Sequence, residues 1–345
     1  MRILLIKLKN LGDTLLLTPV IQGIKQKYPD SHVTAVVRSG TEAMLEGCQD
    51  LDEIIVSSAL AESRRGSWLG QMQALLNIRA QQYDWVFELT DNSRGRWLTC
   101  WSRGTNKCTS AHGWPIPWYF RRCFTALSDQ NWHLMHRVEK DYMLIAQFLD
   151  LAPEVPPLCY EVADPTARPV EVKEPYAVIH PVSRWKRKAW PAERWVETGR
   201  ALSVLGLSLV ISSGPDPEEV DLADEICSSL GSSAVSTGGR LSWRELAQTI
   251  THASLFVGLD TAAMHLAAAR QCPVVALFGP SIEHHWHPWK SPYEIVSPGG
   301  LLHRNYPAFL YDAEERSMLD ISVDEVLMAC RRMLHKSDQT GTLTA

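Results

Sequence analysis

Long uncharged apolar runs are missing from this chain of 345 residues. No window reaches the roughly 18 apolar residues that a membrane-spanning helix needs. The opening MRILLIKL is interrupted by lysine too early to act as a signal peptide. We therefore expect a cytoplasmic protein without a membrane span.

Paired cysteines and glycine-rich dinucleotide motifs are also absent. The eight cysteines form no C-x-x-C pair, which argues against a zinc ribbon or a disulfide framework and favours buried, reduced thiols. No G-x-G-x-x-G follows the first predicted strand, which argues against a nicotinamide oxidoreductase. The net charge of −5 argues against a general nucleic-acid binder. A composition that is 45% hydrophobic and 21% charged is typical of a soluble globular enzyme.

The length predicts two domains, because one hydrophobic core rarely serves so many residues. Six prolines between Leu151 and Pro175 suit neither a helix nor a central strand, so this stretch is interpreted as a linker. We predict a first domain at 1–151, a linker at 152–175, a second domain at 176–322, a C-terminal helix at 323–336 and a flexible tail at 337–345.

Apolar, β-rich runs alternate with helical patterns in both halves, which predicts parallel sheets covered on both faces. The predicted strands are Arg2–Leu8, Ser31–Val37, Glu53–Ser57, Trp85–Thr90, Tyr176–His180, Ser208–Ser212, Leu255–Leu259 and Val274–Phe278. The predicted helices are Asp13–Tyr28, Trp68–Gln82, Ala192–Leu205, Pro217–Leu230, Ser242–His252, Thr261–Arg270 and Val323–His335. The fold class is therefore α/β, with two doubly wound Rossmann-like domains facing a central cleft, where such sheets bind ligands.

Three segments that follow predicted strands carry chemistry. Gly12 and Asp13 open the first helix, and Asp13 suits either a helix cap or a group that faces the cleft. Four cations lie between Arg184 and Lys188, close to Ser183, and suit either a pyrophosphate site or a solvated loop. The segment Gly258–His265 runs into an alanine-rich helix whose first turn offers free N–H groups to an anion, although Asp260 also suits a cap and His265 a core position.

Together these segments resemble the ADP-heptose:lipopolysaccharide heptosyltransferases of glycosyltransferase family 9, over essentially the whole chain. The resemblance is carried by L-G-D-x-x-L-x-x-P at Leu11–Pro19, K-x-W-P at Lys188–Pro191 and G-x-D-[ST]-x-x-x-H at Gly258–His265. It implies the GT-B fold, an ADP-heptose donor, a lipid-anchored lipopolysaccharide inner-core acceptor and no cofactor. Two departures are Ala262, where relatives often have glycine, and the unusually basic Arg184–Arg187.

The resemblance also implies roles for individual residues. Asp13 would be the catalytic base, and Lys188 would stabilise the charge on the donor phosphates. The other donor-binding residues would be Ser183, Arg184, Glu218, Asp260, Thr261, Ala262 and His265. Transfer by direct displacement would invert the anomeric centre, and a carboxylate base is needed because an acceptor hydroxyl is a weak nucleophile.

Basic and aromatic residues concentrate between Thr90 and Lys140, with eight cations, three anions and five tryptophans, one of them Trp114. Such a surface suits a phosphorylated partner at the inner face of the inner membrane, although a solvated face beside core aromatics is an equal alternative. Gly12, Arg94, Arg96, Arg121 and Arg122 are the predicted acceptor-binding residues.

Rival interpretations remain open from the sequence. Asp50 and Asp52 form the one Asp-x-Asp triplet, which could hold a divalent ion or end a loop; we favour the loop and expect a metal-independent enzyme. A different nucleotide-sugar donor and a non-catalytic sugar-nucleotide binder are the functional alternatives. Three motif residues kept together, Asp13, Lys188 and Asp260, argue against the binder, since a binder needs no base.

Overall fold

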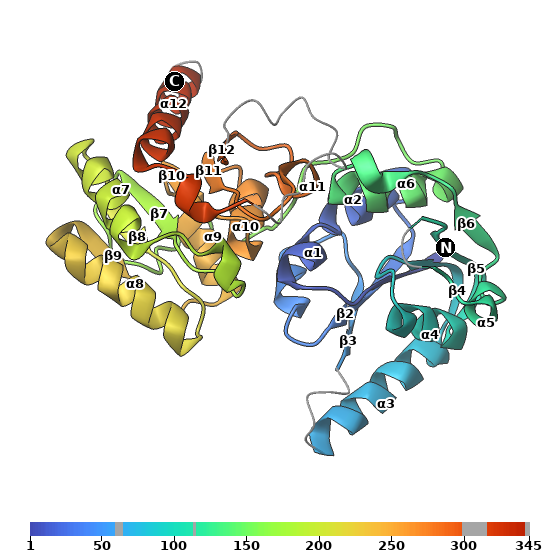
Figure 1. Ribbon diagram of the computed structural model, residues 1–345. Helices are drawn as coiled ribbons and strands as arrows, with labels where there is room; N and C mark the ends of the chain where they lie inside the picture. Colours follow the sequence, from blue (N-terminus) through green and yellow to red (C-terminus); the bar gives the residue numbers. More distant parts are fainter. Residues whose placement is uncertain (59–64, 113–114, 299–315, 342–345) are drawn as a thin grey trace. The chain divides into compact units, whose positions relative to one another are not determined.

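The chain divides into two compact units, Met1–Glu161 and Val162–Ala345. The computed structural model describes residues 1–58, 65–112, 115–298 and 316–341, and for residues 65–71 and 337–341 it describes the backbone alone. Trp114 and the last four residues of the predicted tail lie outside the described residues. Both units are α/β layers around a parallel sheet (Figure 1).

The sheet of the first unit has the order β3-β2-β1-β4-β5-β6, and its pairs are all parallel. Its strands are β1 Arg2–Lys7, β2 His32–Arg38, β3 Glu53–Ser57, β4 Gln82–Glu88, β5 Arg103–Ser110 and β6 Ala126–Ser128. Strand β1 lies in the middle and is buried from Ile3 to Lys7, because neighbours cover it on both sides and helices on both faces. Its carboxyl end leads directly to Asp13.

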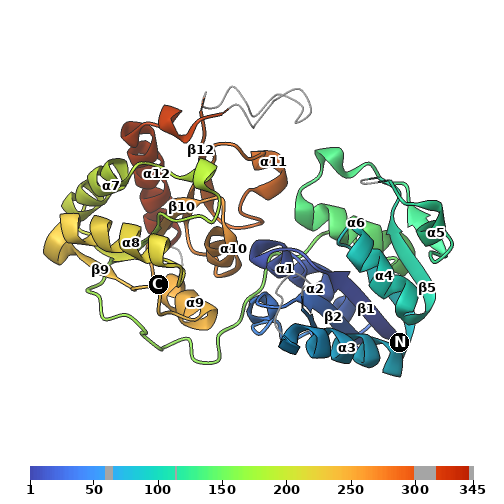
Figure 2. The ribbon, with the colours of Figure 1, turned by 60° about the horizontal axis from the view of Figure 1, so that its bottom comes forward.

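Helices cover both faces of this first sheet. They are α1 Leu11–Leu15, α2 Thr18–Lys27, α3 Arg65–Ala80, α4 Ser93–Trp101, α5 Trp118–Arg121 and α6 Arg137–Leu149. Helices α2 and α6 pack together on one face, and α3 and α4 on the other, with α4 between α3 and α5 (Figures 1 and 2). Ala74, Ile78 and Leu98 join the second layer to the core of the sheet.

The second unit repeats this architecture with the order β12-β11-β10-β7-β8-β9. Its strands are β7 Tyr176–His180, β8 Ser208–Ile211, β9 Ala234–Ser236, β10 Leu255–Leu259, β11 Val274–Leu277 and β12 Tyr293–Val296. Its helices are α7 Ala192–Val204, α8 Pro217–Leu230, α9 Trp243–Thr251, α10 Ala262–Ala269, α11 Glu283–Trp286 and α12 Val323–Gly341. None of the helices in the described part of the chain is long and apolar enough to cross a bilayer.

Two predicted helices differ from the structure. The predicted helix Asp13–Tyr28 is two helices, α1 and α2, separated at Leu16 and Leu17. Pro19 lies in the first turn of α2, where it has no N–H to continue the ladder from α1. At the other end of the chain α12 continues to Gly341, past the predicted end at residue 336, because no proline or glycine interrupts it earlier.

The proline-rich segment predicted as a linker is packed in part against the first unit. Leu158 and Tyr160 are buried, and the backbone N–H of Cys159 donates to Thr18 Oγ1 at 3.1 Å. Farther along, Gln248 Nε2 donates to the carbonyl of Asp164 within the second unit. Both ends of the segment are therefore held by the unit on their own side.

The prediction of reduced thiols throughout is wrong for two cysteines. Cys100 at the end of α4 and Cys123 just after α5 form a disulfide. Their separation of 23 residues gave no motif, and the pairing arises because α4 and α5 pack side by side. Among the described residues, six cysteines take no part in this disulfide: Cys48, Cys108, Cys159, Cys227, Cys272 and Cys330.

Gly23 allows the close packing of α2 against α6, and this contact gives a stability prediction. An ideal Cβ at Gly23 would lie 2.5 Å from Tyr142 Cε2. Although alanine favours a helix by about 1 kcal/mol over glycine, the overlap should dominate. We expect Gly23→Ala to lower the free energy of unfolding by about 1–3 kcal/mol in urea denaturation. The exposed control Gln26→Ala should change it by less than about 0.5 kcal/mol; a Gly23→Ala protein as stable as that control would contradict the packing argument.

Candidate active site

The second unit brings Lys188 and Asp260 together. Lys188 ends a 3₁₀ turn, Lys186–Lys188, in the loop after β7, and Asp260 directly follows β10, the neighbour of β7 in the sheet. Lys188 Nζ lies 2.6 Å from Asp260 Oδ2 and 3.0 Å from the Asp260 carbonyl oxygen. Both side chains are largely buried, with 15% and 8% exposed, so each compensates the charge of the other.

Helix α10 begins directly after this ion pair. Thr261 is its N-cap residue with an extended backbone, and its hydroxyl makes no cap hydrogen bond. The N–H groups of the first turn have no intrahelical acceptor, and together with the helix dipole they favour an anion. Ala262 presents only a methyl group there, while His265 is buried one turn later and contacts the Trp286 ring at 6.4 Å. A cation and a helix N-terminus thus meet at the carboxyl edge of the second sheet.

The remaining predicted donor residues lie near this edge but are more exposed. Ser183 accepts a hydrogen bond from the Trp185 N–H at 3.3 Å, and Arg184 is exposed. Glu218, in the first turn of α8, forms an exposed ion pair with Lys186 at 2.7 Å, and this pair raises the pKa of Lys186. The sequence did not predict this pairing.

A buried histidine lies below the cationic loop. His180 ends β7, and its Nδ1 lies 3.0 Å from Ser212 Oγ at the end of β8. Burial lowers the pKa of His180 to about 4, so the ring is neutral at pH 7. The strand that leads into the cationic loop therefore ends in an uncharged, hydrogen-bonded ring. The signal in the sequence was a polar residue that closes an apolar strand.

In the first unit, Asp13 lies in the first turn of α1, half-buried. Its Oδ2 accepts a hydrogen bond from the Asn10 N–H at 3.3 Å, which is the cap role that the sequence left open. One long hydrogen bond leaves most of the carboxylate lone pairs available to another donor. Asp13 therefore caps its helix and still keeps the capacity to accept a proton.

Buried charges surround Asp13. Lys7, the last residue of β1, is 4% exposed and forms an ion pair with Asp141 of α6. Burial alone would lower the pKa of Lys7, but the carboxylates of Asp141, Asp13 and Asp91 outweigh it and raise the pKa. Lys7 therefore stays charged, and Asp13 lies within its electrostatic reach. In contrast, burial and the charge of Lys7 lower the pKa of Lys9.

A second ion pair extends this cluster. Asp91 follows β4 with a left-handed backbone, φ 58°, and its carboxylate pairs with Lys140 of α6. The Lys140 ammonium lies 4.5 Å from the centre of the Trp132 ring, and the Arg137 guanidinium lies 4.6 Å from it. Such cation–π contacts hold both cations at the carboxyl edge of the sheet. Lys7, Asp91, Lys140 and Asp141 are not among the site residues predicted from the sequence.

Glu88 holds the turn that carries Asp91. Its side chain is fully buried at the end of β4 and accepts hydrogen bonds from the N–H groups of Thr90 and Asp91 and from the Thr109 hydroxyl, at 2.9–3.0 Å. Burial, with a smaller contribution from Asp91, raises the pKa of Glu88 to about 7. Gly95 fits beside it because any Cβ there would overlap Glu88 Oε1.

The four predicted acceptor arginines fall into two classes. Arg94 donates to the Ser57 carbonyl and hydroxyl, and Arg96 is buried and donates to the Pro115 carbonyl at 3.0 Å. These two side chains bind loops of their own unit, so they do not form part of an open basic surface. Arg121 and Arg122 are exposed on α5 and after it. Gly12 is half-buried beside Asp13.

The Asp-x-Asp triplet is used for structure. Asp52 Oδ2 pairs with Lys25 at 2.8 Å and accepts from the Val33 N–H at 2.7 Å, while Asp50 is exposed. Among the described residues, no group of three His, Cys, Asp or Glu side chains is placed to hold a metal ion. The loop interpretation of Asp50 and Asp52 therefore agrees with the contacts of Asp52.

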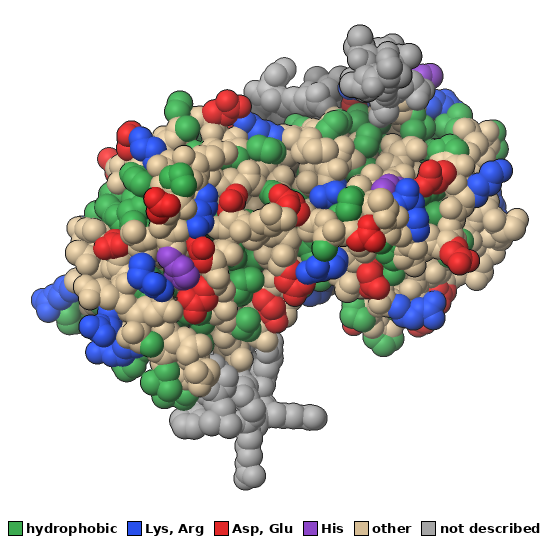
Figure 3. Space-filling view, turned by 180° about the vertical axis from the view of Figure 1, so that it is seen from behind, with side chains coloured by type: hydrophobic (Ala, Val, Ile, Leu, Met, Phe, Trp, Pro, Cys, Tyr) green, Lys and Arg blue, Asp and Glu red, His purple; other side chains and the backbone are tan. Residues whose placement is uncertain are grey.

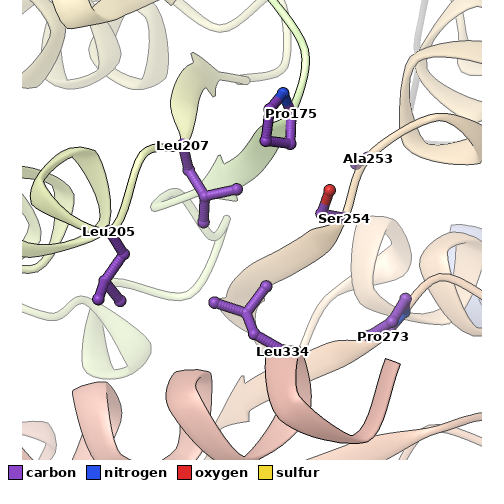
Figure 4. Close-up of a pocket in the computed structure, with 7 residues that line it drawn as sticks. All are labelled: Pro175, Leu205, Leu207, Ala253, Ser254, Pro273 and Leu334. Carbon is purple, nitrogen blue, oxygen red and sulfur yellow. The ribbon is translucent and has the colours of Figure 1, made fainter. Parts of the chain in front are cut away.

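A shallow cavity of about 410 Å³ lies at the other end of the second sheet. Its residues precede strands β7, β8, β10 and β11, and Leu334 of α12 closes it (Figure 4): Pro175, Leu205, Leu207, Ala253, Ser254, Pro273 and Leu334. It is lined by apolar side chains and the hydroxyl of Ser254, and none of its lining residues is charged. Ligands of doubly wound sheets bind at the carboxyl ends of strands, so this cavity is unsuited to a nucleotide.

Comparisons with known proteins identify the family of the chain. The model of glycosyltransferase family 9 (heptosyltransferase) matches residues 73–305. Lipopolysaccharide heptosyltransferase 3 of Escherichia coli is 26% identical over 96% of this chain and 98% of that protein.

Solved structures show the fold. A family 9 glycosyltransferase from Veillonella parvula superposes with a TM-score of 0.81 at 20% identity, covering 97% of each chain. Escherichia coli heptosyltransferase WaaC with ADP gives 0.78 at 17% identity, covering 96% of this chain and all of that one. The chain therefore has the GT-B fold and belongs to glycosyltransferase family 9, the heptosyltransferases.

Proposed function

We propose that this enzyme transfers L-glycero-D-manno-heptose from ADP-heptose to a heptose of the lipopolysaccharide inner core, as heptosyltransferase III does. The observation that carries the proposal is the pairing of chemistry at the two sheet edges: a carboxylate among buried cations at Asp13, and a cation with a helix N-terminus at Lys188 and Thr261. The opening LKNLGDTLLLTPVIQGIKQKYP and the tryptophan-rich middle look most like heptosyltransferase III. The similarity to a relative of that name supports the choice.

The reaction assigns a role to each edge. Asp13 accepts the proton of the acceptor hydroxyl, while the oxygen of that hydroxyl bonds to the anomeric carbon of the donor heptose. The bond from that carbon to the ADP oxygen breaks, and the electron pair goes to the phosphate. Lys188 and the first turn of α10 stabilise this negative charge, so the anomeric centre inverts in one displacement. Asp260, held by Lys188, keeps a second oxygen for a heptose hydroxyl.

Other donor contacts follow from position. Thr261, Ala262 and His265 border the helix N-terminus that would bind pyrophosphate. Ser183 and Arg184 lie on the loop before Lys188, and Glu218 would meet the ribose after release from Lys186. No metal is assigned a step, because the leaving phosphate has a cation and a helix dipole at hand.

The acceptor side is proposed to use cations. Lys9 and Arg137 belong to the charge cluster of Asp13, and Arg121 and Arg122 are exposed in the same unit. Anionic inner-core groups would be attracted by these side chains. The lipid anchor of the acceptor would bring the enzyme to the inner face of the inner membrane as a peripheral protein. Transfer from a panel of nucleotide sugars to a purified inner-core acceptor tests the function directly, and preference for a donor other than ADP-heptose would overturn it.

Asp13→Asn tests the base. The amide keeps the shape and can still accept from the Asn10 N–H, but it cannot take a proton. We expect kcat to fall by about 10²–10⁴ while the affinity for ADP stays the same. The matched control is Asp30→Asn, an exposed aspartate of the same unit. More than half of the wild-type kcat in Asp13→Asn would remove the residue from this role.

Lys188→Gln tests stabilisation of the leaving group. Loss of the cation should lower kcat by about 10²–10³, and Lys188→Arg should restore part of it by keeping the charge. Because Asp260 would lose its counter-ion, the unfolding temperature must be measured in parallel. The exposed Lys173→Gln is the control and should leave kcat unchanged. If Lys188→Arg proved as slow as Lys188→Gln while both folded normally, charge stabilisation would be the wrong role.

Chelation tests the absence of a metal step. Turnover should persist in excess EDTA, because Lys188 and the α10 N-terminus can take the charge that a divalent ion takes elsewhere. Initial rates with and without chelator give the answer. A rate that falls to near zero in EDTA and returns with added magnesium or manganese would support the alternative in which Asp50 and Asp52 hold a divalent ion.

A further inference from the structure

An exposed aromatic and apolar surface lies on helices α3, α4 and α5 of the first unit. We call it the aromatic face, and its members are Met72, Leu76, Trp97, Trp101, Trp118 and Tyr119. Trp97 and Trp118 are 65% and 70% exposed, and Leu76 is 56% exposed. Elsewhere in the described part of this unit, the exposed large hydrophobic side chains are Met1 and Leu134. The exposed apolar surface of the unit is therefore concentrated on three adjacent helices.

Direct contacts connect these helices into one surface. Trp101 Nε1 donates to the Leu75 carbonyl of α3 at 3.0 Å, and Trp97 meets the Phe120 ring of α5 edge-on at 5.3 Å. The Cys100–Cys123 disulfide links α4 covalently to the residues that follow α5. Figures 1 and 2 agree in placing α4 between α3 and α5. The aromatic residues are therefore held in fixed positions relative to one another.

The inner sides of these helices already have partners. Ala74 and Ile78 of α3 and Leu98 of α4 pack on the sheet as part of the core. Trp97 and Trp101, one turn apart on α4, point away from that core and are exposed instead. Burying these rings is therefore not needed to complete the core. A contiguous exposed apolar patch of this kind marks an interaction site.

The charge at the aromatic face has one sign. The Arg79 guanidinium lies 4.8 Å from the centre of the Trp101 ring, and that of Arg122 lies 5.2 Å from the Trp118 ring. Arg103 and Arg121 are exposed beside them. Residues 65–81 and 92–128 contain no Asp or Glu, although the whole chain has a net charge of −5. Figure 3 shows acidic and basic side chains interspersed on the face of the molecule that it presents.

Tryptophan with arginine matches one kind of partner better than others. Tryptophan rings are favoured at the boundary between lipid headgroups and hydrocarbon, and arginine binds anionic headgroups. We propose that the aromatic face docks on an anionic lipid bilayer, with Trp97 and Trp118 at the level of the headgroups. This deepens, and rests on, the proposed transfer to a lipid-anchored acceptor. The cations assigned to the anionic surface are Arg79, Arg103, Arg121 and Arg122. Arg94 and Arg96 are left out because their side chains bind loops of their own unit.

Vesicle co-sedimentation tests the proposal without any turnover. The full chain is mixed with vesicles of equal parts phosphatidylglycerol and phosphatidylcholine, or of phosphatidylcholine alone. We expect binding to the anionic vesicles only, and weakening by salt because the Debye length is about 10 Å at 0.1 M. Trp97→Ser with Trp118→Ser, and separately Arg121→Gln with Arg122→Gln, should each weaken binding at least tenfold, since one cation near such a surface contributes about fivefold.

Matched controls come from the second unit. Val204→Ser with Leu319→Ser removes two equally exposed apolar side chains, and Arg240→Gln with Arg244→Gln removes two exposed cations. Both control pairs should bind vesicles like the wild type, and all variants should keep the wild-type circular dichroism spectrum and unfolding temperature. Equal weakening by test and control pairs, or wild-type binding in the test pairs, would overturn the proposal.

Two further measurements separate this proposal from others. Sedimentation velocity without lipid should show the same oligomeric state for wild type and Trp97→Ser/Trp118→Ser. A wild-type dimer that is lost in the variant would overturn the proposal, because the aromatic face would then bind a second copy of the chain and not a bilayer. Transfer to a delipidated core acceptor in solution should be unchanged in Trp97→Ser/Trp118→Ser. If the wild type binds vesicles but transfers no heptose, the proposed function is rejected and the docking surface is supported. If it transfers heptose but binds no vesicles, the docking surface is rejected and the proposed function is supported.

Discussion

Parallel pairing around one central strand in each unit is the constraint on which the rest of the structure depends. β1 is hydrogen-bonded to β2 and β4, and β7 to β8 and β10, so the loops that follow these strands emerge at one edge of each sheet. Asp13 and Asp91 come from two such loops, and Lys188 and Asp260 from two others. Residues far apart in the chain thereby become neighbours, and the burial of both central strands makes their positions rigid.

Charge compensation then determines what those neighbours can do. Burial alone would lower the pKa of Lys7, but the carboxylates of Asp141, Asp13 and Asp91 outweigh burial and hold the lysine charged. His180 shows the opposite solution, since it has no carboxylate beside it and burial keeps it neutral. Glu88 lies between these extremes with three hydrogen-bond donors. Each group owes its state to its partners and not to its residue type.

The sequence indicated most clearly the strands that are almost entirely apolar. β1, β7 and β10 were readable because burial on both faces demands such runs. β5, with Cys108 as its one apolar residue, is a strand because β4 pairs with it, which no local pattern reveals. Motifs gave Asp13, Lys188 and Asp260, but the ion pairs of Lys7 and Lys140 join residues 134 and 49 positions apart, and local sequence carries no signal for such partners. A lysine inside RILLIK and a glutamate inside WVFELT were the available hints.

The two sides of helix α4 have different surroundings. Leu98 and Thr99 are buried, whereas Trp97 and Trp101 are exposed and contact the neighbouring helices α5 and α3. The sheet therefore depends on the inner residues of the helix, and the chemical character of the protein surface depends on the outer ones. The same helix thus completes the core of the unit with one side and forms exposed surface with the other.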